Sequence, residues 1–168
     1  MTHKKIGIVM GSDSDLTTMK EAVNILKEFE VDFDVHVISA HRSPERAHAY
    51  AVEAEKEYDV IIAGAGGAAH LAGVIASLTP IPVIGVPMPT AGLGGLDSLL
   101  SMVQMPSGIP VPTMGIGKPG AINAAILAIQ IAGVSDPELR QKLVSYKKKL
   151  ADEVAKKDKV MRTELGLS

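Results

Sequence analysis

Short apolar runs along the chain alternate with longer segments in which apolar residues recur every three or four positions. The short runs end at turns rich in glycine, serine or proline, and they predict buried β-strands. The periodic segments predict helices; in the first of them Met19, Val23 and Leu26 recur at helical spacing. We predict strands at 5–10, 33–38, 59–63, 81–86 and, most weakly, 109–114, and helices at about 16–29, 44–57, 68–77, 98–103 and 121–132.

This alternation predicts an α/β protein with a three-layer α/β/α architecture and a central five-stranded parallel sheet, as in flavodoxin-like folds. Right-handed crossovers place all the loops that follow strands at one edge of such a sheet. Ligands bind at that edge, outside the carboxyl ends of the strands. The segments 11–15, 39–44 and 64–70 are therefore expected to meet, although they lie far apart in the sequence.

The C-terminal segment differs from the rest of the chain. Residues 135–168 carry a net charge of +3, whereas the preceding residues carry −5. An apolar stripe predicts a long amphipathic helix at about 135–162, which either exposes its basic face or packs its stripe on another subunit. The segment 121–132 has almost no polar face, which also suggests a neighbouring copy. We predict a single domain over 1–168, with its core at about 5–133.

Composition narrows the possible functions. The 168 residues include no cysteine, which removes disulfides, thiolate nucleophiles and cysteine-bound metals. A net charge of −2 and 3% aromatic residues argue against nucleic acid as a partner. The longest apolar stretch, 121–134, is shorter than the roughly 20 residues of a membrane span. A cytoplasmic location is the default expectation.

The first two predicted loops carry the polar side chains most suited to chemistry. Ser12, Ser14 and Asp15 follow a strand and precede a helix, where they either bind a phosphate or cap the helix, and Asp15 suits sugar hydroxyls better than an anion. His41 and Arg42 follow the second strand. Arginine can grip phosphate, and histidine can both donate and accept a proton near neutral pH. Alternatively, Arg42 pairs with Glu45 and His41 caps a helix.

The third loop is rich in glycine. Gly64, Gly66 and the residues around them fit G-x-G-x-x-A, but no acidic residue follows about 20 positions later, so a dinucleotide site is not favoured. Glycines there would instead let the backbone approach a flat ligand. His70 either joins the site or is an ordinary residue at a helix start. The chain contains no P-loop motif, no G-x-S-x-G elbow and no pair of histidines spaced for a metal.

Several motifs occur together in one order, and in this they resemble a known family. The motifs are Met10-Gly-Ser-Asp-Ser-Asp15, Ser39-Ala-His-Arg-Ser-Pro44, Ala63-Gly-Ala-Gly-Gly-Ala-Ala-His-Leu71, Gly85-Val-Pro87, Asp97-Ser-Leu99 and Gln104-Met-Pro-Ser-Gly-Ile-Pro-Val111. From residue 6 to about 132 the chain resembles the bacterial-type 5-(carboxyamino)imidazole ribonucleotide mutases of purine biosynthesis.

The resemblance implies a ribonucleotide monophosphate substrate, a carboxylate moved from nitrogen to a neighbouring ring carbon, no ATP, biotin or metal, and a homo-octamer. It implies an acid–base role for His41 and ribose and phosphate binding by Ser12, Asp15 and Arg42. The other residues to which the resemblance assigns substrate contacts are Ser14, Ser39, Gly64, Ala65, Gly66, Gly67 and His70.

The proposed chemistry needs one proton that is given and then taken back. Loss of carbon dioxide from the exocyclic nitrogen requires a proton there, and attack of the ring carbon on carbon dioxide releases one, so a single histidine can serve both steps. Two alternatives stay open. One is a carboxylase that joins aminoimidazole ribonucleotide to free carbon dioxide, and the other is a non-catalytic nucleotide-binding domain.

Overall fold

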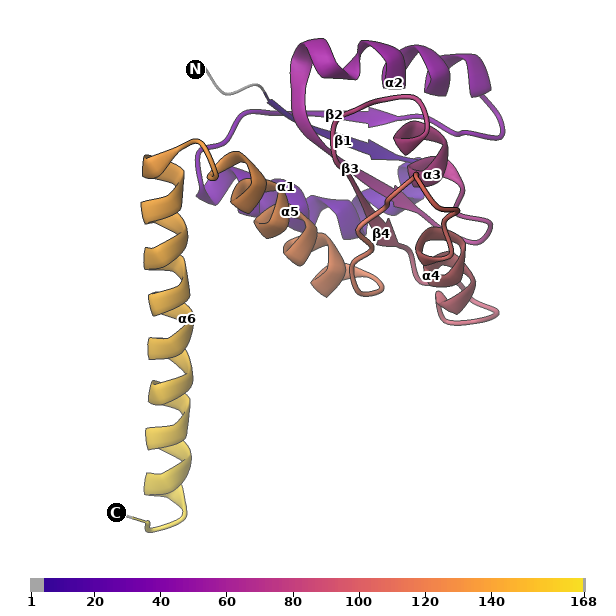
Figure 1. Ribbon diagram of the computed structural model, residues 1–168. Coiled ribbons are helices and arrows are strands. Elements are labelled where there is room, and N and C mark those ends of the chain that lie inside the picture. Colours follow the sequence, from indigo (N-terminus) through magenta and orange to yellow (C-terminus); the bar gives the residue numbers. More distant parts are fainter. Residues whose placement is uncertain (1–4, 168) are drawn as a thin grey trace. The chain divides into compact units, whose positions relative to one another are not determined.

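The computed structural model describes residues 5–167 (Figure 1). Four strands alternate with helices. The strands are β1 (Lys5–Met10), β2 (Phe33–Val37), β3 (Tyr58–Ala65) and β4 (Val83–Pro87). The helices are η1 (Asp13–Asp15), α1 (Leu16–Glu28), α2 (Pro44–Glu57), α3 (Leu71–Ala76), α4 (Leu96–Val103), α5 (Lys118–Ala132) and α6 (Pro137–Glu164).

The strands form a parallel sheet in the order β2-β1-β3-β4. This confirms the α/β class and four of the predicted strands, and it is the order of a flavodoxin-like sheet over its first four members. The chain runs from β1 outward to β2 and then returns to the other side of β1 for β3. The strand order therefore reverses between β1 and β3, and their carboxyl ends flank a natural crevice.

The fifth predicted strand, 109–114, is wrong for the described residues, because this segment makes only an isolated parallel bridge between Thr113 and Gly85. Its backbone does run beside β4, since Met114 donates to the Gly85 carbonyl at 2.9 Å. Along a strand, alternate N–H groups face the same neighbour. Pro110 and Pro112 occupy the alternate positions before Met114 and have no N–H to donate, so the pairing cannot extend.

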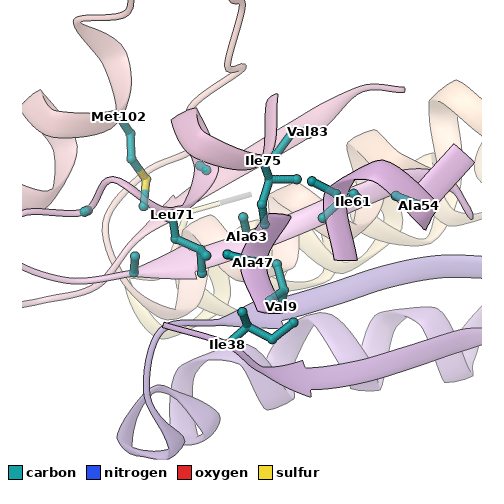
Figure 2. Close-up of a cluster of buried hydrophobic side chains, with 14 of the residues drawn as sticks. Val9, Ile38, Ala47, Ala54, Ile61, Ala63, Leu71, Ile75, Val83 and Met102 are labelled. Carbon is teal, nitrogen blue, oxygen red and sulfur yellow. The ribbon is translucent and has the colours of Figure 1, made fainter. Parts of the chain in front are cut away.

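Helices cover both faces of the sheet (Figure 1). Helices α1 and α5 pack against each other on one face, while α2 and α3 pack together on the other. Strand β3 is buried along almost its whole length, and its alternate residues Ile61 and Ala63 join the core beneath α2 and α3 (Figure 2). Residues from α2 and α3 in that core include Ala47, Leu71 and Ile75. This packing fixes the strand ends that carry the loops discussed below.

Helices α3, α4 and α5 begin at residues other than those predicted; α4 starts at Leu96 rather than 98, and α5 starts at Lys118 rather than 121. Helix α3 starts at Leu71 rather than 68, because residues 67–70 form tight turns with bonds from Ala69 N to Gly67 O and from His70 N to Ala68 O, both 2.8 Å. Neither Asp97 nor Ser98 caps α4, whose N-cap is Gly95 with a left-handed φ of 96°. The side chains of Asp97 and Ser98 are engaged elsewhere.

The chain divides into two compact units, Met1–Ala132 and Gly133–Ser168, close to the predicted limit of the core. In the second unit α6 begins after Asp136, whose Oδ1 accepts hydrogen bonds from the Glu138 and Leu139 amides at 2.8 and 3.1 Å. That the two units make one domain stays a prediction. Among the described residues, none of the helices combines the length and apolar character needed to cross a bilayer.

Candidate functional site

A pocket of about 430 Å³ opens at the carboxyl ends of β1, β2 and β3. Its walls come from the loops after these strands, as the topology predicts. Nine of the predicted site residues line it: Ser12, Ser14, Asp15, Ser39, His41, Arg42, Ala65, Gly66 and His70. Four lining residues were not predicted: Gly11, Ala40, Ala68 and Leu71. These four lie inside the quoted motifs. Gly11 and Ala40 are small residues next to polar ones and could have been found by that signal, whereas nothing local marks Ala68 or Leu71.

The first wall of the pocket is a turn of 3-10 helix closed by its own side chains. The Ser12 amide donates to Asp15 Oδ2 at 3.2 Å, and the Ser14 amide donates to the Ser12 hydroxyl at 3.4 Å. Ser12 is thus the N-cap of η1, and the Asp15 side chain makes no cap bond to α1. Burial raises the pKa of Asp15 above its ordinary value, opposed by the hydrogen bonds from Ser12 and Ser14. A half-buried carboxylate facing a pocket suits neutral hydroxyl donors better than an anion.

Arg42 ties the first two loops together. Its guanidinium donates to the Gly11 carbonyl at 3.2 Å and to the Ser39 hydroxyl at 3.4 Å. Ser39 is fixed in turn, because Ser43 Oγ donates to the Ser39 carbonyl at 2.9 Å. In the described part of the chain Arg42 makes no ion pair with Glu45, and the alternative prediction of such a pair is wrong. A guanidinium carries five N–H donors, so an oriented Arg42 has further donors for an anion in the pocket.

The third feature is a pair of imidazoles. His41 Nε2 lies 2.9 Å from His70 Nδ1, and the two rings meet edge to face with centroids 5.0 Å apart. His41 follows β2 and His70 follows β3, so the contact joins two loops. A hydrogen bond between two ring nitrogens requires that one carries the hydrogen and the other accepts it. Both side chains are exposed to the pocket side of the loops, where a proton held by the pair can reach a ligand.

Two predicted glycines, Gly64 and Gly67, are not among the residues that line the pocket. Gly64 is buried at the end of β3, where a Cβ would come 2.6 Å from Met19 Sδ and 2.8 Å from Met88 Cε. Gly67 has a left-handed φ of 68°, and its amide donates to the Ser98 hydroxyl at 2.9 Å. Of the stretch from Gly64 to Gly67, Ala65 and Gly66 line the pocket, and the substrate contacts of all four residues stay a prediction.

Ser98 was not predicted as part of the site. The Asp97-Ser-Leu99 motif contained it, but its spacing suggested only a helix cap.

In the part of the chain that the structure describes, side chains of His, Cys, Asp and Glu form no group of three or more suited to a metal ion.

Comparisons with known proteins identify the family of this chain. A family model described as AIR carboxylase matches residues 5–153. The N5-carboxyaminoimidazole ribonucleotide mutase of Pyrococcus abyssi is 61% identical over 144 residues, which cover 85% of this chain and 82% of that protein. The mutase of Escherichia coli K12 is 54% identical over 151 residues, 89% of each chain. The crystal structure of Treponema denticola PurE matches with a TM-score of 0.85 and 27% identity, covering 94% of this chain and 98% of that one. The chain belongs to the AIR carboxylase family.

Proposed function

We propose that this protein is an isomerase that converts N5-carboxyaminoimidazole ribonucleotide into 4-carboxy-5-aminoimidazole ribonucleotide in purine biosynthesis. The relatives at 54% and 61% identity carry this activity in their names. The observation that carries the proposal is the pocket where an oriented guanidinium, Arg42, and an imidazole, His41, stand on adjacent residues. The guanidinium suits the phosphate end of a nucleotide, and the imidazole suits proton transfer at its base.

The binding roles follow from the polarity of each wall. Arg42 is the phosphate ligand, because its side chain is already oriented by Gly11 and Ser39 and keeps donors for an anion. The hydroxyls of Ser12, Ser14 and Ser39 assist. Asp15 accepts from the ribose hydroxyls, which supply neutral donors to a carboxylate that burial makes costly to ionise.

The chemistry is a decarboxylation followed by a recarboxylation. His41 gives a proton to the exocyclic nitrogen as the N–C bond to the carboxylate breaks and carbon dioxide leaves. The ring carbon then attacks carbon dioxide, and His41 takes the proton that this carbon releases. The carboxylate has moved, the proton count is unchanged, and the balance needs no ATP, biotin or metal. General acid–base catalysis of this kind contributes roughly 10²–10⁴-fold.

The remaining walls hold the reacting parts together. Ala65, Gly66 and Ala68 make a small-residue surface that can close on the flat base and on carbon dioxide between the two steps. His70 Nδ1 is the partner of His41 Nε2 in the hydrogen bond between the two rings, either as donor or as acceptor. Gly64 and Gly67 remain proposed substrate contacts next to this wall.

The test is an absorbance assay of the purified protein with N5-carboxyaminoimidazole ribonucleotide in the absence of added bicarbonate. Conversion to the carbon-carboxylated product supports the proposal. Turnover only of aminoimidazole ribonucleotide with bicarbonate would identify the carboxylase that the family's description names. Nucleotide binding without turnover of either substrate would identify a non-catalytic domain.

We further propose a homo-oligomer, an octamer by resemblance. Its support is the apolar stripe of α6, in which Leu139 is buried while Leu150 and Val154 are 42% and 66% exposed. Apolar side chains along one helix stripe suit a subunit contact. A monomer at micromolar concentration in sedimentation would contradict it. The cytoplasmic location stays a prediction, to be tested by cell fractionation.

A further inference from the structure

We propose that Ser98 of α4, assisted by Ser101, is a positioning residue that sets the distance between His41 and His70. Ser98 is fully buried and is the polar side chain in the core of the described residues. It is not among the residues that line the pocket, and its contact with the predicted site residues is through the backbone amide of Gly67. The proposal rests on the proposed function for its kinetic part, whereas its structural part can be tested without substrate.

The hydroxyl of Ser98 links two strand ends. It accepts a hydrogen bond from the Gly67 amide at 2.9 Å and donates one to the Met88 carbonyl at 2.8 Å. Gly67 follows β3 and Met88 follows β4, so one buried hydroxyl clamps the loop of one strand to the end of the next. A buried hydroxyl is costly unless it is hydrogen-bonded, and here both its donor and its acceptor are used.

Ser101, one turn further along α4, contacts the carbonyl of Gly67, whereas Ser98 binds its amide. Its hydroxyl lies 3.3 Å from the Gly67 carbonyl and 2.7 Å from the Asp97 carbonyl. Since a serine has a single hydroxyl hydrogen, these two acceptors compete, and the shorter contact is the stronger. Ser98 is therefore the main anchor of Gly67 and Ser101 the weaker one.

Glycine suits position 67 because of its backbone conformation, and not because neighbouring atoms leave no room for a side chain. Its φ of 68° lies in the left-handed region, whereas a Cβ at this position would meet nothing within 4 Å. A left-handed residue fixed at its amide sets the direction of the chain that follows. Two tight turns then lead through Ala69 to His70, the N-cap residue of α3.

Only two residues of constrained backbone, Ala68 and Ala69, thus separate the anchored Gly67 from His70. His70 Nδ1 lies 2.9 Å from His41 Nε2 only while this short path keeps its course. Release of the Gly67 amide would let the path relax and would move the His70 ring relative to His41. Misplacement of a reacting group by about 1 Å can cost roughly 100-fold in rate.

The kinetic experiment is the substitution Ser98→Ala in the full chain. We expect kcat for the mutase reaction to fall by about 3- to 13-fold, no more than loss of the His41–His70 hydrogen bond itself would cost. KM should change less than about threefold, because the loops that carry Arg42 and Asp15 are untouched. Ser101→Ala should reduce kcat by a smaller factor. A purely structural role would instead lower the melting temperature and leave kcat of the folded enzyme unchanged.

A substrate-free experiment separates this inference from the proposed function. In the NMR spectrum of the ligand-free protein, Ser98→Ala should shift the ring resonances of His41 and His70 and leave those of His36 and His48 in place. This result stands even if the wild-type protein converts neither imidazole nucleotide. Unchanged His41 and His70 resonances together with wild-type kcat would overturn the proposal.

Two controls match the perturbation. Ile129→Val, in a buried position of α5, lowers stability away from the loop, and Ser77→Ala removes a hydroxyl bond to the Val74 carbonyl of 2.8 Å. Both should keep kcat and the His70 resonances.

If Ser98→Ala does not fold, two substitutions at Gly67 test the proposal instead. Asparagine tolerates positive φ better than alanine, and the space is open, so Gly67→Asn should retain more kcat than Gly67→Ala. Equal activity of the two Gly67 variants would contradict the proposed role of the left-handed backbone.

Discussion

The substitution His41→Asn separates catalysis from binding and from folding. His41 is exposed, and among residues 5–167 its ring makes one hydrogen bond, to His70 at 2.9 Å. Its removal creates no cavity and strands no buried polar group. The free energy of unfolding should therefore change by no more than about 1.5 kcal/mol, the upper value for one such hydrogen bond.

The expected loss is in kcat. Asparagine cannot give a proton to the exocyclic nitrogen or take one from the ring carbon, so the whole acid–base contribution of roughly 10²–10⁴-fold should disappear. This corresponds to about 2.7–5.4 kcal/mol in the activation free energy, at 1.36 kcal/mol for each factor of ten. Binding of the carboxylated product should be preserved, because Arg42 and the serines of the pocket remain.

His70→Asn is the matched control, since it removes the same 2.9 Å hydrogen bond but leaves His41 in place. The loss of one such bond is worth about 0.5–1.5 kcal/mol, so kcat should fall by no more than about 13-fold. The assays are absorbance for turnover, calorimetry with the product for affinity, and thermal unfolding for stability. A His41→Asn enzyme with more than a tenth of wild-type kcat, or a loss equal to that of His70→Asn, would refute the assignment of the proton carrier.

Three further outcomes are expected. Arg42→Ala should weaken binding of the nucleotide about 10- to 160-fold in calorimetry, because a charged hydrogen-bond partner worth about 1.5–3 kcal/mol is lost, and unchanged affinity would exclude it as the phosphate ligand. Burial raises the pKa of the Asp15 carboxyl, so its ionisation costs stability as pH rises through that pKa. Asp15→Asn should therefore raise the melting temperature at pH 7. The gain should vanish in acid, where the carboxyl is protonated in both the folded and the unfolded chain. Gly120→Ala should destabilise by about 1–3 kcal/mol or more in urea unfolding, because a Cβ there would overlap the Gly115 carbonyl oxygen, whereas the open position of Gly92 should accept alanine without measurable loss.

The four strands of the sheet could be predicted because their signal is local. A strand covered by helices on both faces reads as a continuous apolar run, and β3 is buried in this way along almost its whole length. The strand predicted at 109–114 does not form, and the reason can be read from the same residues. Apolar character suggested a strand, but Pro110 and Pro112 remove the donors that pairing with β4 requires.

The sequence by itself also determined which loops would meet. Parallel strands joined by helices bring their carboxyl ends to one edge, so the segments carrying Asp15, His41 and His70 had to converge once the alternation was recognised. Residue chemistry at those three places then indicated a phosphate-bearing ligand and proton transfer. None of this required knowledge of side-chain positions.

Only the tertiary structure decided how the loops are held once they meet. The 2.9 Å contact of His41 with His70, the bond of Arg42 to the Gly11 carbonyl and the clamp of Ser98 on Gly67 join residues about 30 positions apart. Such bonds follow from the path of loops whose backbone groups must find partners wherever they are buried. That requirement leaves no periodic pattern in the chain, which is why Ser98 looked like a helix cap.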